Sequence, residues 1–96
     1  MVARADLKTR VGTILARKAR TELGNGASVR VEKSHYRDYV HVYVTSRKFA
    51  RRTREERSAL IWGWLEADLS REELAKVTLV MALTPTEERD LMGALR

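Results

Sequence analysis

The stretch YVHVYVTSRKFARRTREER, Tyr39 to Arg57, joins a strand to a helix through a strongly basic turn. Every second residue from Val40 to Val44 is a valine, which is the pattern of a strand with one buried face. Thr53 and Glu56 have the spacing of a capping box, so we expect a helix to begin there. Six of the chain's 19 basic residues lie in this stretch, and they raise the question of which anion they meet.

A second alternating run precedes this strand. In SVRVEK (residues 28–33) Val29 and Val31 share one side. The polar segment SHYRD (residues 34–38) lies between the two runs and is suited to a turn. The two runs therefore predict an antiparallel hairpin with one valine face directed inward.

Apolar residues at three- and four-residue spacing predict two amphipathic helices. The first runs from about Asp6 to Leu23 and ends at GNG (Gly24 to Gly26), since glycine and asparagine tolerate the left-handed conformation that ends helices. The second begins at Thr53 and carries its apolar stripe to Leu69. A second capping box, Ser70 with Glu73, predicts one more short helix.

The last part of the chain reads as a strand and a helix. VTLVMAL (residues 77–83) is a continuous apolar run, which is typical of a central strand buried on both faces. Thr84, Pro85 and Glu87 then have the positions of an N-cap and a first helical turn. Residues 1–96 are thus predicted to form one α+β domain of order αββααβα, with a small three-stranded sheet and helices packed on one face.

Composition narrows the possible functions. The chain has 96 residues, 44% of them hydrophobic, and a net charge of +6, which favours a polyanion as partner. It has no cysteine, which excludes a disulfide framework, a thiol nucleophile and a thiolate metal ligand of its own. We find neither a signal peptide nor an apolar run long enough to span a bilayer, so we expect a cytoplasmic protein.

Several weak motifs, spread over about residues 10 to 90, together resemble one known family, the BolA-like proteins. They are the segments VEKSH (Val31 to His35) and LTPTE (Leu83 to Glu87) and the spaced residues Ser46, Phe49, Arg57 and Leu65.

The resemblance implies a class II KH-like fold and a regulatory role in transcription. It also implies a monothiol glutaredoxin as partner, with a shared iron–sulfur cluster. The chain departs from the family at two positions that bear on this role. It has Arg51 where the family carries a glycine, and a position near Lys76 where the family carries a histidine.

The basic turn is the candidate nucleic-acid site. In KH-like domains this turn lies near the loop that clamps the nucleic-acid backbone, although the GxxG of such loops is absent here. Guanidinium groups beside a helix N-terminus suit phosphate. The alternative is a solvated, self-paired helix start, with Arg54 against Ser58 or the neighbouring glutamates. The candidates for phosphate contact are Arg47, Lys48, Arg51, Arg52 and Arg54.

Two residues of the same stretch are predicted to be structural. Arg57 falls on the apolar stripe of the helix, where its long side chain can lie over the core edge and bond carbonyl groups of the preceding loop. Phe49 is predicted to plug the core beneath the loop rather than to stack on a base.

Aromatic residues offer a second way to contact nucleic acid. Tyr36, Tyr39 and Tyr43, with Arg37 beside them, could stack on unpaired bases from an open sheet face. Tyrosine is equally what an ordinary strand carries on a half-exposed face. Trp62 lies off the apolar stripe, and exposure there would mark a contact with a partner protein.

Metal binding and catalysis have little support in the sequence. The two histidines, His35 and His41, have only carboxylates to join them, and we expect no metal site built by this chain alone. His35 could contribute one ligand to a cluster whose thiolates come from a partner. Ser34 beside His35 lacks an orienting acid, so we expect no enzyme and no cofactor.

We therefore expect a small basic protein that binds DNA or RNA. One alternative is a protein that docks a glutaredoxin-like partner, and the other is a ligand-free module that forms a homodimer.

Overall fold

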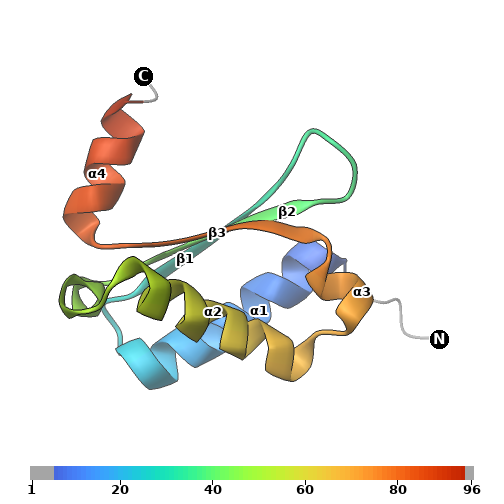
Figure 1. The fold of residues 1–96 in the computed structure, drawn as a ribbon, viewed down its shortest axis with the longest axis horizontal. Helices are drawn as coiled ribbons and strands as arrows, with labels where there is room; N and C mark the ends of the chain where they lie inside the picture. Colours follow the sequence, from blue (N-terminus) through green and yellow to red (C-terminus); the bar gives the residue numbers. More distant parts are fainter. Residues whose placement is uncertain (1–5, 95–96) are drawn as a thin grey trace.

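The computed structural model describes residues 6–94 and confirms the predicted α+β class and element order. Figure 1 shows the arrangement. The elements are α1 (Leu7–Leu23), β1 (Ser28–Lys33), β2 (Val40–Thr45), the 3-10 helix η1 (Arg47–Arg51), α2 (Arg54–Asp68), α3 (Arg71–Leu74), β3 (Val77–Leu83) and α4 (Pro85–Ala94). The 3-10 helix within the basic turn is an addition to the predicted order.

The sheet has the strand order β1-β2-β3. β1 and β2 form the predicted antiparallel hairpin, in which Val31 lies opposite Val42. β3 runs parallel to β2, with a register irregularity between Val40 and His41. The prediction that residues 77–83 form a central strand buried on both faces is wrong, because β2 holds the centre. A continuous apolar run cannot distinguish the two places, and Leu79 on the open face of β3 is 36% exposed.

Two helices cover one face of the sheet. α1 packs mainly on β1 and α2 on β3, so both lie in one layer below the sheet in Figure 1. α4 continues from the end of β3 and rises on the opposite side, apart from this layer (Figure 1). None of the helices within residues 6–94 combines the length and the apolar character that crossing a bilayer requires.

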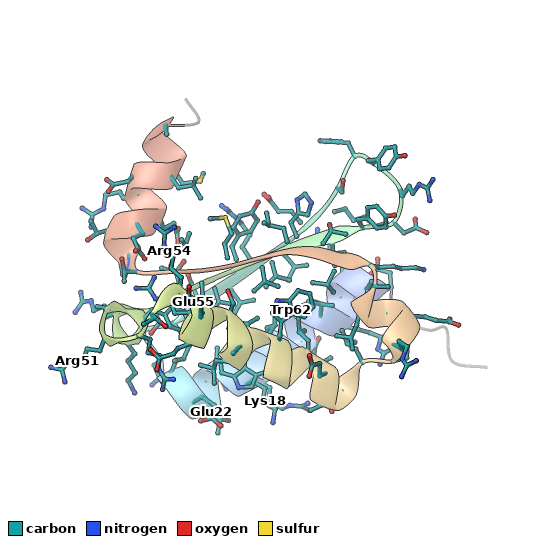
Figure 2. All side chains as sticks on the ribbon, viewed as in Figure 1. Lys18, Glu22, Arg51, Arg54, Glu55 and Trp62 are labelled. Carbon is teal, nitrogen blue, oxygen red and sulfur yellow. The ribbon has the colours of Figure 1, made fainter. Side chains whose placement is uncertain are left out.

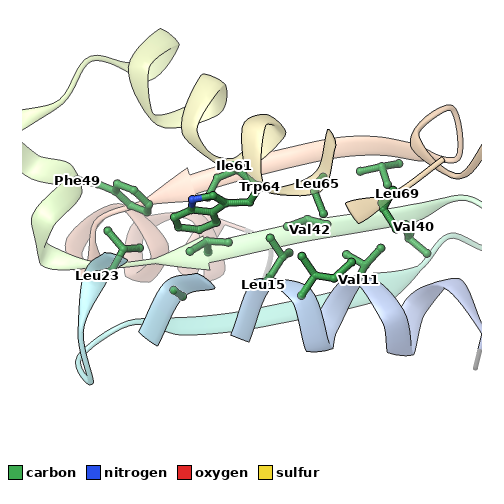
Figure 3. Close-up of a cluster of buried hydrophobic side chains, with 14 residues drawn as sticks. Val11, Leu15, Leu23, Val40, Val42, Phe49, Ile61, Trp64, Leu65 and Leu69 are labelled. Carbon is green, nitrogen blue, oxygen red and sulfur yellow. The ribbon is translucent and has the colours of Figure 1, made fainter. Parts of the chain in front are cut away.

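The core lies between the two-helix layer and the sheet (Figure 3). The three valines of β2 have no exposed surface, which confirms the predicted inward valine face. Leu15 of α1 and Ile61 and Leu65 of α2 meet these valines and are equally buried. Trp64, at 6% exposure, belongs to the same cluster.

The helix ends form as their sequence signals predict. Gly24 ends α1 with a positive φ of 80°, a conformation that glycine adopts without strain. Both predicted capping boxes, Thr53 with Glu56 and Ser70 with Glu73, have reciprocal hydrogen bonds. These signals depend only on neighbouring residues, so no distant contact had to be known.

Candidate nucleic-acid interface

The basic turn is held against the protein by two buried residues. Ser46 is 3% exposed; its N–H donates to the carbonyl of Leu83 at 2.9 Å, and its Oγ accepts the N–H of Lys48 at 3.1 Å. Phe49 has no exposed surface and is the largest of the fully buried side chains, which confirms it as the predicted core plug. η1 is therefore a short helix anchored to the core and to the end of β3.

Arg57 ties three segments together. Its Nε donates to the carbonyl of Arg52 at 3.1 Å, and its Nη1 donates to the carbonyl of Ala82 at 3.3 Å and to Glu87 Oε1 at 2.7 Å. The residue is only 7% exposed, and its guanidinium carbon lies 5.9 Å from the centre of the Phe49 ring. The structural role predicted for Arg57 is confirmed, and Arg57 is not free to bind phosphate.

Glu87 is the anion that Arg57 meets. The backbone N–H of Thr84 donates to Glu87 Oε1 at 2.8 Å, as expected of an N-cap. This hydrogen bond, followed by that of Arg57, lowers the pKa of Glu87 below its ordinary value of 4.5. The ionised carboxylate therefore joins the start of α4 to the start of α2.

This carboxylate makes the stability of the protein depend on pH. Because folding lowers its pKa, Glu87 contributes stability that is fully present above about pH 4.5 and lost as the pH falls through the lowered pKa. We expect Glu87→Gln to be less stable than the natural protein at neutral pH. The variant should also lose less stability as the pH falls from 5 to 3. The free energy of unfolding should depend less steeply on pH because the variant lacks this one carboxylate. Urea unfolding at each pH measures both effects.

A suitable control is Glu66→Gln, which removes an exposed carboxylate of α2. It should leave the dependence of stability on pH nearly as in the natural protein. Equal slopes for Glu87→Gln and the natural protein would show that Glu87 is not linked to folding in this way.

All five predicted phosphate contacts are exposed. The ion pairs within residues 6–94 are Arg10–Glu73, Arg17–Asp68, Arg30–Glu32 and Arg57–Glu87. None of these pairs uses any of the five, so no neighbouring glutamate holds one of them in an ion pair. Their exposure fits both a phosphate contact and a solvated helix start.

Three of the five lie on η1. Phe49 fixes which side of this helix faces the core, and the other sides carry Arg47, Lys48 and Arg51. Residues three apart in a 3-10 helix lie above one another, so Lys48 and Arg51 share one side. Figure 2 shows Arg51 pointing away from the body of the protein into solvent. We call these three residues the η1 cluster.

The helix start itself is less suited to an anion than the sequence suggests. Glu56 already occupies it, since its carboxylate accepts the N–H of Thr53 at 2.8 Å and its N–H donates to Thr53 Oγ1 at 3.1 Å. The Thr53 contacts lower the pKa of Glu56, with a smaller contribution from the nearby charge of Arg52. A phosphate at this end of α2 would meet a carboxylate, so Arg52 is less available than the η1 cluster.

Arg54 faces a different surface. It lines a hollow between α2, β3 and α4, together with Ser58 of its own helix and Glu87 and Asp90 of α4. The two carboxylates across this hollow disfavour a phosphate there. The structure therefore divides the five predicted residues, with Arg52 and Arg54 set apart from the η1 cluster by acidic neighbours.

The tyrosines are not placed beside the η1 cluster. Tyr36 and Tyr39 lie in the loop between β1 and β2, with ring centres 6.2 Å apart, and Figure 1 shows this loop at the opposite end of the sheet from η1. Tyr43 lies on the open face of β2, where the guanidinium of Arg30 covers its ring at 4.4 Å. Sequence reasoning missed Arg30, although the hairpin register places it directly opposite Tyr43.

The two histidines and Trp62, the other residues considered as contacts, do not lie together in one site. His35 is exposed in the hairpin loop, and His41 is half-buried on the open face of β2. Residues 6–94 contain no group of three or more His, Asp or Glu side chains that could hold a metal ion, so a cluster ligated by His35 depends on ligands from a partner. Trp62 is half-buried against the core rather than exposed.

Comparison of the chain with protein-family models finds no matching family, and a search of curated proteins finds no matching relative. The resemblance to BolA-like proteins therefore stays a prediction.

Proposed function

We propose that this protein is a cytoplasmic nucleic-acid-binding protein that grips the phosphate backbone through the η1 cluster, with Arg52 and Arg54 at its margin. The proposal rests on the exposure of Arg47, Lys48 and Arg51 and on their charges, which are unpaired within residues 6–94. They are exposed, they belong to none of the ion pairs within residues 6–94, and they sit on a helix that Phe49 and Ser46 hold in place.

The form of the cluster favours a polymer over a small anion. η1 lies at one end of the molecule (Figure 1), its three cations are exposed, and Figure 2 shows Arg51 pointing away from the body of the protein. Such a surface can neutralise successive phosphates along a strand, and each neutralised phosphate releases counterions. The net charge of +6 adds long-range attraction to the same partner.

The test is binding of a labelled oligonucleotide, followed by fluorescence anisotropy at several salt concentrations. We expect affinity to fall steeply as salt rises. We expect the double variant Lys48→Ala/Arg51→Ala to bind about tenfold more weakly at low salt. Its plot of log K against log salt should be shallower by about 1.4 for a single strand and about 1.8 for a duplex, since two contacts are lost.

The control is the double variant Lys8→Ala/Arg71→Ala, which removes the same charge at the start of α1 and of α3. Both positions are exposed, and both helix starts lie at the other end of the molecule from η1 (Figure 1). The control should keep the slope of the natural protein. The proposal fails if the natural protein does not bind at low salt, or if both double variants bind equally well.

A further inference from the structure

Within residues 6–94, β3 has one edge with no neighbouring strand. The carbonyl of Leu83 accepts the N–H of Ser46 and therefore points toward β2. The carbonyl of Ala82 points the other way, where it accepts from Arg57 at 3.3 Å. Backbone groups alternate in direction along a strand, so Val80 directs its N–H and C=O to the free edge as Ala82 does.

Apart from Arg57, which covers the carbonyl of Ala82, this edge lacks the features that protect exposed edges in other proteins. Charged side chains, proline or a covering segment usually prevent two edges from pairing. The seven residues of β3, Val77–Leu83, include no charged residue and no proline. The other edge of the sheet, β1, carries Arg30, Glu32 and Lys33. The two edges of one sheet thus differ sharply, and only the β3 edge is suited to pairing.

The space beside the edge is open. A hollow of about 390 Å³ lies along the second half of β3, between Arg54 and Ser58 of α2 and Asp90 and Leu91 of α4. An added strand could therefore approach the backbone of Val80 between the two helices.

We propose that a second copy of this chain occupies this edge, with the two β3 strands paired antiparallel about a two-fold axis near Val80. The two β3 strands of such a dimer are self-complementary. The N–H of Val80 in each copy can donate to the carbonyl of Val80 in the other copy. The pairing joins two sheets into one and covers the unprotected edge of both. It does not depend on nucleic-acid binding.

Charge complementarity selects a second copy as the occupant. Lys76 is exposed just before β3, and Asp90 is exposed on α4, which follows β3. Antiparallel pairing brings the beginning of one β3 beside the end of the other. Lys76 of each copy then lies near Asp90 of its partner, and this attraction occurs twice because of the two-fold axis.

Analytical ultracentrifugation of the full chain, from micromolar to millimolar concentration, tests the proposal. We expect a reversible dimer. Lys76→Glu and Asp90→Lys should each weaken it about tenfold, since each change replaces two attractions by two repulsions. The double variant Lys76→Glu/Asp90→Lys should restore the natural dissociation constant. Both positions are exposed, so circular dichroism should show each variant folded as the natural protein is.

Hydrogen exchange locates the contact. The amide of Val80 points to the free edge, so it should exchange quickly at micromolar concentration and about tenfold or more slowly where the dimer prevails. The proposal is overturned if the chain stays monomeric up to millimolar concentration. It is equally overturned if a dimer forms without protecting Val80, or if the double charge swap fails to restore association.

Discussion

Phe49→Ala is expected to lower the free energy of unfolding by about 3–5 kcal/mol. Phe49 has no exposed surface and is the largest fully buried side chain, so alanine would leave a cavity between η1 and the core. Such a loss is a large fraction of the roughly 5–15 kcal/mol that stabilises an ordinary domain. Urea unfolding followed by circular dichroism measures it.

Two further variants interpret the result. Phe49→Leu fills most of the cavity and should cost clearly less than Phe49→Ala. Ala50→Ser changes the exposed neighbour on η1 and should stay within about 0.5 kcal/mol of the natural protein. A loss below about 1 kcal/mol for Phe49→Ala would show that the loop is not anchored through this ring.

Arg57→Ala is expected to lower the free energy of unfolding by about 2–4 kcal/mol. The change leaves the carbonyls of Arg52 and Ala82 without this donor and removes the cation beside Glu87. The carboxylate of Glu87 keeps 37% exposure of its side chain, so water compensates part of the lost pairing. The same urea unfolding experiment measures the effect.

The fork of the guanidinium, not its charge alone, accounts for this role. Lysine places one compact ammonium where arginine donates from both Nε and Nη1, so Arg57→Lys should recover less than half of the loss. Arg54→Ala, one turn earlier on the exposed side of α2, should cost under about 0.5 kcal/mol. Full recovery by Arg57→Lys would contradict the importance of the separate carbonyl contacts.

Phe49 and Arg57 hold the basic turn in one position against the rest of the protein. Phe49 fixes the rotation of η1 about its own axis, and Arg57 fixes the turn against β3 and α4. Cations held by such anchors lose less conformational entropy on binding than cations on a free loop. The proposed contact of the η1 cluster with a phosphate backbone therefore rests on these anchors as well as on charge.

Much of the fold is predictable from the sequence because its signals are local. The helix stop at Gly24 and the caps at Thr53, Ser70 and Thr84 need only residues within one turn, and all of them form. The inward valines of β2 follow from the two-residue period of a strand. Phe49 and Arg57 were likewise recognisable as structural, since phenylalanine is usually buried and Arg57 lies on an apolar stripe.

The candidate site was only partly predictable. The sequence shows that five basic residues lie within one turn. It does not show which of them lie near carboxylates in the folded protein. Glu56 is sequence-local, whereas Asp90 reaches the vicinity of Arg54 only because α4 follows β3 across the start of α2. Arg30 over Tyr43 required the register of the hairpin in the same way.

The α+β class and the element order follow from local sequence patterns, because the hydrophobic period and the helix caps act over a few residues. The central place of β2 and the edge place of β3 follow from tertiary contacts, since strand order depends on where the crossover through α2 places the last strand. The tertiary contacts among residues 6–94 also leave the cations of η1 outside any ion pair, while Arg57 is buried against Glu87. Both outcomes arise from contacts between segments far apart in the chain, which local patterns do not encode.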